Sequence, residues 1–273
     1  MTVETQRANA EPRLGDIARQ FAVVFAAIFQ VYASYVGGAS VGTIAQENRS
    51  LILPAGYAFS IWGAIFLLCG LYAIYQALPA QRENPTFRAI GWWTAAAFAA
   101  NGAWIYAYTS RQFILAQAII FAGFVFAGGA YLRFTRPDSG GSVATIQHWV
   151  VGPALGLLFG WLTAANIVGL AGTLVAQGFA ATGQGAEIGG GALLLLGGAV
   201  GFFVILVSKR GPEAAWIAYG AAVLWALAAI IVEQRSASTV TTGVAAVCAV
   251  LVLAAMIGPW HAPSRPAENP RTA

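Results

Sequence analysis

Long uncharged stretches constrain the fold of this chain more than any other feature of its sequence. The 14 Lys and Arg residues and the 10 Asp and Glu residues fall in short polar intervals, and apolar stretches separate these intervals. Each stretch is close to the ~20 residues that a helix needs to cross ~30 Å of hydrocarbon. Strands of a membrane barrel would alternate apolar and polar residues instead. The sequence therefore predicts an all-α, polytopic membrane helix bundle.

The apolar stretches predict about eight transmembrane helices. A loop is expected at 178–186, where Gly, Thr and Gln gather. The predicted spans cover residues 18–37, 54–78, 90–109, 113–132, 149–174, 188–208, 214–232 and 239–258.

The distribution of basic residues predicts the orientation of this bundle. With the N-terminus inside, eleven Arg and Lys residues fall in inner intervals, and only Arg49, Arg111 and Arg235 fall outside. This positive-inside bias predicts that both termini are cytoplasmic, and we expect a multi-pass protein of the bacterial inner (cytoplasmic) membrane. The basic residues are scattered at membrane edges, which favours contact with membrane lipid and argues against nucleic acid as a partner.

The predicted spans hold no ionisable residue at depth; Asp16 and Arg19 are read as preceding the first span. Proton-driven transport, ion channels with acidic rings and intramembrane acid–base catalysis all require such groups. No catalytic motif, metal motif or disulfide pattern is present, and Cys69 and Cys248 are read as small core residues. The sequence therefore disfavours an enzyme, except one with catalytic groups at the membrane surface.

Neutral hydrogen-bonding groups lie beside aromatic rings in the spans. The third span places Asn101, Trp104 and Tyr108, with Thr94, within about 80° on one helical face. The fifth span brings Trp161 and Asn166 to similar depth. A lone buried Asn more often hydrogen-bonds a neighbouring helix than a ligand, so that alternative stays open. Gly152, Gly156 and Gly160 precede Trp161 at four-residue spacing, which predicts close approach by another helix.

The start of the second span, PAGYAFSIWGAIF at 54–66, is the most distinctive segment. Pro54 suits a helix start, where its missing N–H costs nothing, and Gly56 keeps the local surface open. Phe59, Trp62 and Phe66 follow at helical spacing. They form either a flat aromatic wall of a ligand pocket or ordinary bundle packing.

Three patterns together resemble the tryptophan-rich sensory protein family, which includes the mitochondrial translocator protein (peripheral benzodiazepine receptor). They are Pro54-x-Gly56-x-x-Phe59-x-x-Trp62, the pair Asn101-x-x-Trp104, and Pro153 followed by Trp161 and Asn166. The resemblance covers about residues 18–178 and implies a five-helix core that binds porphyrins, haem or sterol-like lipophiles. Members often form homodimers, so a homodimer is left open here. The chain departs from the family pattern at Pro54-Ala55, where two adjacent prolines are usual, and in the spacing after Pro153.

The resulting expectation is a polar tail at 1–17, a core at 18–178, three additional helices at 186–259 and a polar tail at 260–273. The expected function is an integral membrane binding protein, receptor or sensor for a lipophilic planar small molecule, with a porphyrin or other tetrapyrrole as the implied ligand. The alternatives are transport of a neutral or amphipathic solute and an enzyme acting on a pigment or isoprenoid. The candidate binding residues are Tyr57, Phe59, Trp62, Phe66, Asn101, Trp104, Tyr108, Trp161 and Asn166.

Overall fold

The computed structural model describes residues 14–136 and 144–258, and within these ranges all regular secondary structure is helical. This confirms the predicted all-α bundle. The elements are α2 (Leu14–Glu47), the 3-10 helix η1 (Gly56–Ser60), α3 (Ile61–Ala77), the 3-10 helix η2 (Pro79–Gln81), α4 (Pro85–Thr109), α5 (Phe113–Phe134), the π-helical turn η3 (Gln147–Val151), α6 (Gly152–Ala176), α7 (Gln184–Ser208), α8 (Glu213–Gln234) and α9 (Thr239–Ile257).

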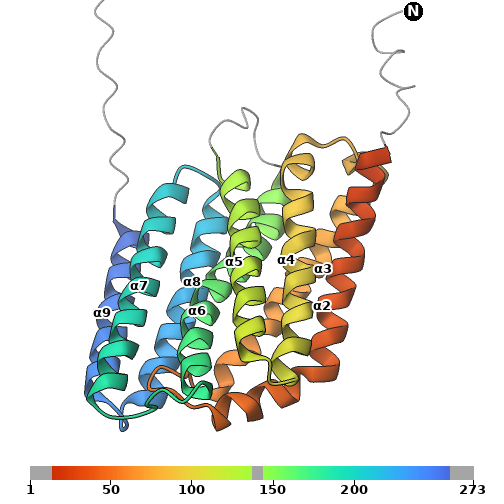
Figure 1. Cartoon of the computed structure of the whole chain (residues 1–273). Coiled ribbons are helices and arrows are strands. Elements are labelled where there is room, and N and C mark those ends of the chain that lie inside the picture. The colour runs from red at the N-terminus through yellow and green to blue at the C-terminus, as the bar shows by residue number, and fades with distance from the viewer. Residues whose placement is uncertain (1–13, 137–143, 259–273) are drawn as a thin grey trace, which may run out of the picture.

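The long helices run alternately up and down, so α2 begins and α9 ends at the same end of the bundle (Figure 1). Helices α2, α3, α6, α5 and α4 pack in that order as a closed ring, because α4 returns to α2. Helix α6 also packs on α7 and α8, and these pack on α9. The predicted tails fall mainly on residues 1–13 and 259–273, which lie outside the described residues.

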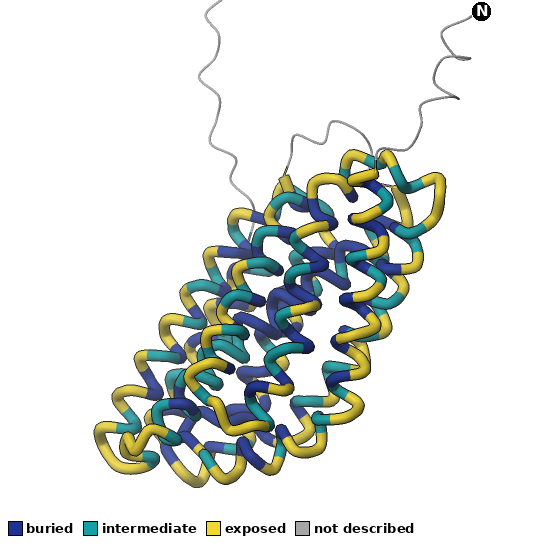
Figure 2. The backbone as a smooth tube through the Cα atoms, turned by 45° about the vertical axis from the view of Figure 1, so that its right-hand side comes forward, coloured by how far each residue is buried: buried dark blue, intermediate teal, exposed yellow. Residues whose placement is uncertain are grey.

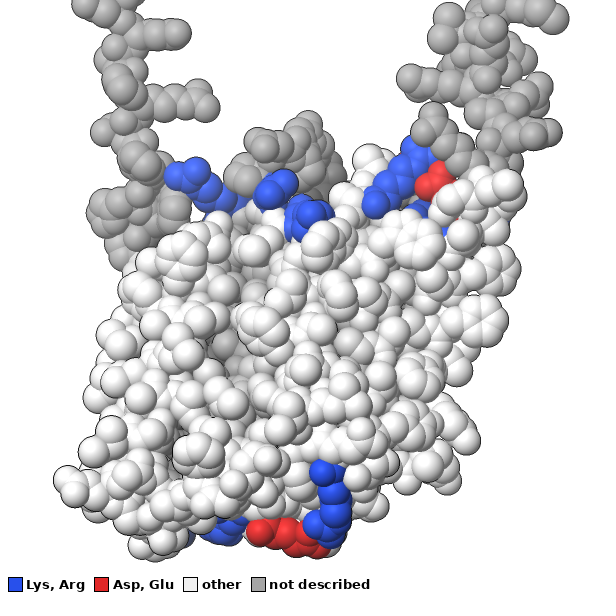
Figure 3. All heavy atoms as spheres, viewed as in Figure 1, with Lys and Arg blue, Asp and Glu red and all other residues white. Residues whose placement is uncertain are grey.

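Buried residues gather where helices face one another, and exposed residues cover the outside of the bundle (Figure 2). The surface in the view of Figure 3 is uncharged between the two ends, where the charged side chains lie. Many large apolar side chains are exposed, including Phe25, Ile74 and Leu196. A bilayer is the solvent in which this surface is stable.

Seven of the long helices in the described ranges are long and apolar enough to cross a membrane. The exception is α4, whose 25 residues include Thr94 and Asn101. Both of these polar side chains are buried, and α4 packs between α2 and α5 in the ring. Because its polar groups face other helices, α4 can lie at the same membrane depth as its more apolar neighbours.

Helix α2 is longer at both ends than the predicted span 18–37, since it runs from Leu14 to Glu47. The Gly37-Gly38 pair does not end it, because α4 packs against this part of α2. Asp16 and Arg19 therefore lie inside the first helix and not before it, and Arg19 is only 1% exposed. The prediction that these two residues precede the first span was therefore wrong.

The predicted glycine contact is confirmed, and the partner helix is α8. A Cβ atom built on Gly152 would lie 3.3 Å from the backbone nitrogen of Ala215, and one built on Gly156 or Gly160 would overlap a backbone oxygen of α8. Only glycine allows two helix backbones to approach this closely. This contact joins the five-helix ring to the last three helices.

Candidate ligand-binding site

The chain before α3 is held against α8 by two hydrogen bonds. The Ala55 N–H donates to the Ala229 carbonyl (3.1 Å), and the Trp225 indole N–H donates to the Ala58 carbonyl (2.9 Å). After Pro54 the chain forms the tight turn η1 before α3 begins at Ile61, so the second span starts as a 3-10 helix. These contacts fix the direction in which the side chains of Phe59 and Trp62 leave the backbone.

Aromatic side chains from three helices meet at the end of the bundle that carries η1. The Trp161 ring of α6 lies edge-on to Phe59 and Trp62, with ring centroids 5.9 and 6.1 Å away. Trp62 stacks on Phe66, and in α4 Trp104 stacks on Tyr108, both at 5.1 Å. Edge-on and offset-stacked pairs are the geometries that aromatic rings prefer.

These rings line a small chamber and an adjoining groove, which together are called the aromatic pocket. The chamber has a volume of about 70 Å³ and the groove about 480 Å³. Pockets for drug-sized ligands have volumes of roughly 300–1,000 Å³, so the groove would hold most of such a molecule. The two spaces share Val41, Phe59, Trp62 and Trp104.

No charged side chain lines the aromatic pocket. Its polar side chains are neutral: Asn48, Ser50 and Tyr108 in the chamber, and Ser34 and Gln46 in the groove. Flat rings with a few neutral hydrogen-bonding groups favour a ligand that gains from dispersion and stacking and needs no charge neutralisation.

Six of the nine candidate residues lie in the aromatic pocket. Five of them line the chamber: Phe59, Trp62, Trp104, Tyr108 and Trp161. Phe66 lines the groove.

The structure places the other three candidates elsewhere. Tyr57 is 47% exposed, and its ring stands edge-on to Trp225 at 5.5 Å. The Asn166 amide donates to the Leu162 carbonyl (2.8 Å) and to the Ile120 carbonyl (3.3 Å), which links α6 to α5. Asn166 thus makes the interhelical bond that is the common role of a buried Asn.

The Asn101 side chain of α4 contacts the Gln30 side chain of α2 next to the groove. Its Nδ2 donates to Gln30 Oε1 (3.2 Å), while Gln30 Nε2 and Asn101 Oδ1 are buried without a partner. Ser34 and Ile105 line the groove, and Gln30 and Asn101 lie one helical turn beyond them. Gln30 was not singled out in the sequence, because its partner lies on another helix.

The wall that α2 contributes to the groove was also missed. Besides Gln46, it consists of Ser34, Gly38, Val41 and Gly42, which share one helical face. The signal was present as small residues at four-residue spacing, Ser34, Gly38 and Gly42. It was overlooked because the predicted first span ended at residue 37.

The segment between α2 and η1 covers the chamber and is held at several points. Arg49 forms an ion pair with Glu233 (2.6 Å), and the Gln234 side chain donates to the Leu53 carbonyl (2.7 Å). Arg111 forms an ion pair with Glu47 (2.7 Å), and the hydrogen bond to this carboxylate raises the pKa of the Arg111 guanidinium. Helix α8 thereby positions a wall of the aromatic pocket, although it lies outside the five-helix ring.

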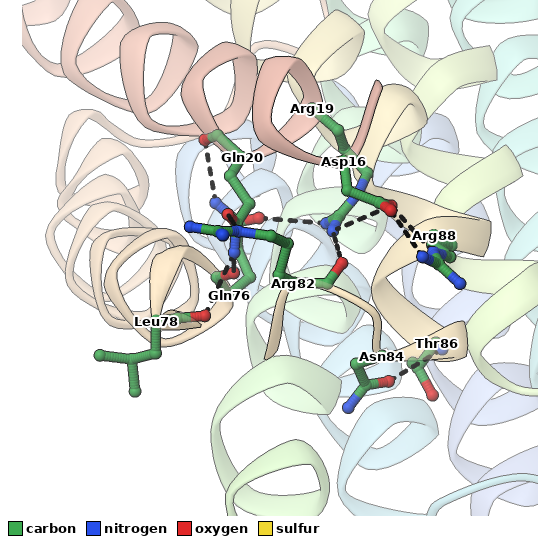
Figure 4. Close-up of polar contacts among 9 residues, drawn as sticks. All are labelled: Asp16, Arg19, Gln20, Gln76, Leu78, Arg82, Asn84, Thr86 and Arg88. Atoms are coloured by element: carbon green, nitrogen blue, oxygen red, sulfur yellow. Dashed lines mark hydrogen bonds and ion pairs between the residues drawn. The ribbon is translucent and has the colours of Figure 1, made fainter. Parts of the chain in front are cut away.

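A second polar cluster lies at the opposite end of the bundle (Figure 4). The Arg19 guanidinium donates to the Arg82 carbonyl (2.8 Å) and to Gln76 Oε1 (3.3 Å), and Arg88 forms a two-pronged ion pair with Asp16. Asn84 caps α4 by accepting from the Thr86 N–H (2.9 Å). Among the described residues, these contacts join α2 to α3, to the segment between α3 and α4, and to the start of α4, and they place no nucleophile beside a base.

Residues 16–258 match a family model described as TSPO-like protein. The chain belongs to the TSPO-like protein family. The matched region includes α7, α8 and α9, so it extends well beyond residues 18–178, on which the resemblance was based. Comparisons with curated proteins and with solved structures found no match. With its seven apolar helices, this TSPO-like chain is a multi-pass membrane protein.

In the described ranges, no three His, Cys, Asp or Glu side chains lie together in a way that could bind a metal ion. Cys69 and Cys248 are both buried as free thiols. The chemistry that the arrangement offers is binding by shape, stacking and neutral hydrogen bonds.

Proposed function

We propose that this TSPO-like protein is a membrane binding protein or sensor for a lipophilic, planar ligand such as a tetrapyrrole or sterol-like molecule. The observation that carries the proposal is the convergence of Trp62, Trp104 and Trp161 from three helices on one uncharged pocket. A planar ligand in the groove would meet ring faces from α3 and α4, which neither helix could offer alone.

Titration with protoporphyrin tests this proposal. The full chain in lipid nanodiscs is titrated while the absorbance of the porphyrin and the tryptophan fluorescence are followed. We expect saturable binding, weakened roughly tenfold by Trp62→Leu or by Trp104→Leu, since a lost aromatic contact costs about 1 kcal/mol in addition to its buried area.

Trp92→Leu is the matched control. Trp92 lies on α4 like Trp104, but it is half exposed and lines neither part of the aromatic pocket. Its replacement should leave the affinity within about twofold of wild type. Weak, non-saturating binding by wild type and by both pocket variants would refute the proposal. A sterol that displaces the porphyrin would show that both ligand classes use one pocket.

The cytoplasmic placement of both termini belongs to the same proposal. Among the described residues, seven Arg and Lys lie at the end of the bundle where α2 begins, against Arg49, Arg111 and Arg235 at the other end. The positive-inside rule supports an inward orientation of the first end. A membrane-impermeant thiol reagent should label a cysteine introduced at Arg111, and not one introduced at Arg136, in intact cells. The reverse labelling would mean that the bundle has the opposite orientation in the membrane.

A further inference from the structure

A second cavity, called the lateral cavity, lies between α6 and α7 at the same end of the bundle as the aromatic pocket. Its volume is about 570 Å³. Leu174 and Val175 of α6 line one side and the segment at residues 50–52 another. Lining residues on α7 run from Gly185 to Leu196, which is about 16 Å along the helix axis. The cavity is therefore long, and it lies partly outside the five-helix ring.

Small and aliphatic side chains make up nearly all of the lining. Among the described residues that form it, Phe179 is the single aromatic side chain and Ser50 the single polar one, and none is charged. A Cβ atom built on Gly185 or Gly189 would meet no heavy atom within 4 Å. The aromatic pocket is lined by flat rings, whereas this cavity is lined mainly by Gly, Ala, Leu, Ile and Val. Such a lining favours an aliphatic chain over a planar ring system.

Ser50 supplies the observation that points to a ligand. This residue is only 8% exposed, and its hydroxyl oxygen is buried without a hydrogen-bond partner. Ser50 lines both the lateral cavity and the chamber of the aromatic pocket, so it forms part of the wall between them. An unpaired buried hydroxyl is unfavourable, and rotation about the Cα–Cβ bond can direct it to a partner in either space.

We propose that the lateral cavity binds one aliphatic chain that ends in a hydroxyl group, such as a long-chain or isoprenoid alcohol, with its hydroxyl bonded to Ser50. A hydroxyl group can donate to and accept from the serine, which satisfies both partners. A phospholipid fits less well, because its headgroup must stay in water while Ser50 is buried, and no basic side chain lines the cavity for a phosphate. This inference does not depend on the ligand of the aromatic pocket.

Photolabelling tests the proposal. The full chain in nanodiscs is mixed with a long-chain alcohol that carries a diazirine in its chain, irradiated, and digested for mass spectrometry. We expect saturable labelling of residues 171–175 and 185–196. Gly189→Leu should fill the space and reduce this labelling at least tenfold. Ala186→Leu serves as a second filling variant if the first does not fold.

Three matched measurements separate the cavity from general lipid contact. Gly243→Leu makes the same change on an exposed position of α9, where a Cβ also meets nothing, and should leave labelling unchanged. Ser50→Ala should weaken the alcohol probe roughly fivefold, as expected for one hydrogen bond, and should not affect a hydrocarbon probe of the same chain. Trp104→Leu should have no effect, because Trp104 does not line this cavity.

Several outcomes would overturn the proposal. Labelling that spreads evenly over the outer faces of α2 and α9 and is insensitive to Gly189→Leu would mean that the probe only solvates the protein surface as a lipid does. Stronger labelling of the same residues by a diazirine phospholipid would mean that the cavity binds a membrane lipid and not an alcohol. Equal loss of both probes in Ser50→Ala would show that the serine has no part in recognising the hydroxyl.

Discussion

Gly156 of α6 and Ala215 of α8 lie backbone against backbone, because a Cβ atom on Gly156 would overlap the Ala215 carbonyl oxygen. One turn further, Gly160 has the same relationship to Tyr219. Backbone atoms cannot move aside as a side chain can, so this seam determines how closely the last three helices approach the ring. It also determines where α8 holds the segment that covers the aromatic pocket.

Replacing Gly156 or Gly160 by valine should force α6 and α8 apart. We expect each variant to lose about 1–3 kcal/mol of stability, the usual cost of overpacking a well-packed contact. Unfolding of the purified protein in mixed micelles measures this loss. Gly243→Val is the control, because a Cβ there meets no atom within 4 Å. Equal stability of all three variants would mean that the seam is looser than the structure indicates.

The buried guanidinium of Arg19 should be required to hold α2 against the segment between α3 and α4. Arg19→Met removes the donors to the Arg82 carbonyl and to Gln76, and we expect a loss of roughly 3 kcal/mol, since a hydrogen bond to a charged group contributes about 1.5–3 kcal/mol. Arg82→Met is the comparison: it keeps the backbone carbonyl that Arg19 contacts and removes only the longer bond from the Arg82 side chain to Gln20 of α2 (3.4 Å), so it should cost less. Similar unfolding midpoints for both variants would contradict this role.

The amides of Gln30 and Asn101 should be energetically coupled. Asn101→Leu removes the N–H that donates to the buried Gln30 Oε1, and we expect a cost of about 1–3 kcal/mol. Gln30→Met combined with Asn101→Leu should cost less than the sum of the single changes, with a coupling of roughly 0.5–2 kcal/mol. A double-mutant cycle of unfolding free energies measures this. Additive effects would show that the two amides bind separate groups.

Gln234 of α8 should control the mobility of the segment over the aromatic pocket. Gln234→Leu removes the donor to the buried Leu53 carbonyl, which should cost about 1–3 kcal/mol and speed amide hydrogen exchange at residues 50–55. A bound ligand should also dissociate faster. Gln184→Leu changes an exposed glutamine at the start of α7 and serves as the control. Unchanged exchange at residues 50–55 would mean that the ion pair of Arg49 with Glu233 and the hydrogen bond from Ala55 to Ala229 hold the segment without Gln234.

The number and order of the helices followed from the sequence, because polar backbone groups in hydrocarbon must be paired within a helix. The glycine spacing in α6 predicted a close helix contact, because residues four apart lie on one face of the same helix. The first span was predicted to end at residue 37, but α2 continues to Glu47 through Gly37 and Gly38, which have low helix propensity. Its contact with α4 outweighs that propensity.

The candidate site was predicted less completely. Phe59, Trp62 and Phe66 share a helical face with one another, and their common location in the pocket follows from helical spacing. Tyr57 is only two residues from Phe59, but Trp225 of α8 lies beside its ring, outside the pocket. No pattern within the second span contains that information, because the partner is about 170 residues away in the chain.

The sequence by itself therefore determined that this chain is a membrane bundle with its charges at the ends, because each of these properties depends on neighbours along one helix. Only the tertiary structure decided which side chains converge. It paired Asn101 with Gln30, directed Asn166 to α5, and buried Arg19 among carbonyl and amide groups. The physical reason is that all helices are apolar on most faces, so the contacts between them depend on small local differences in shape and hydrogen bonding.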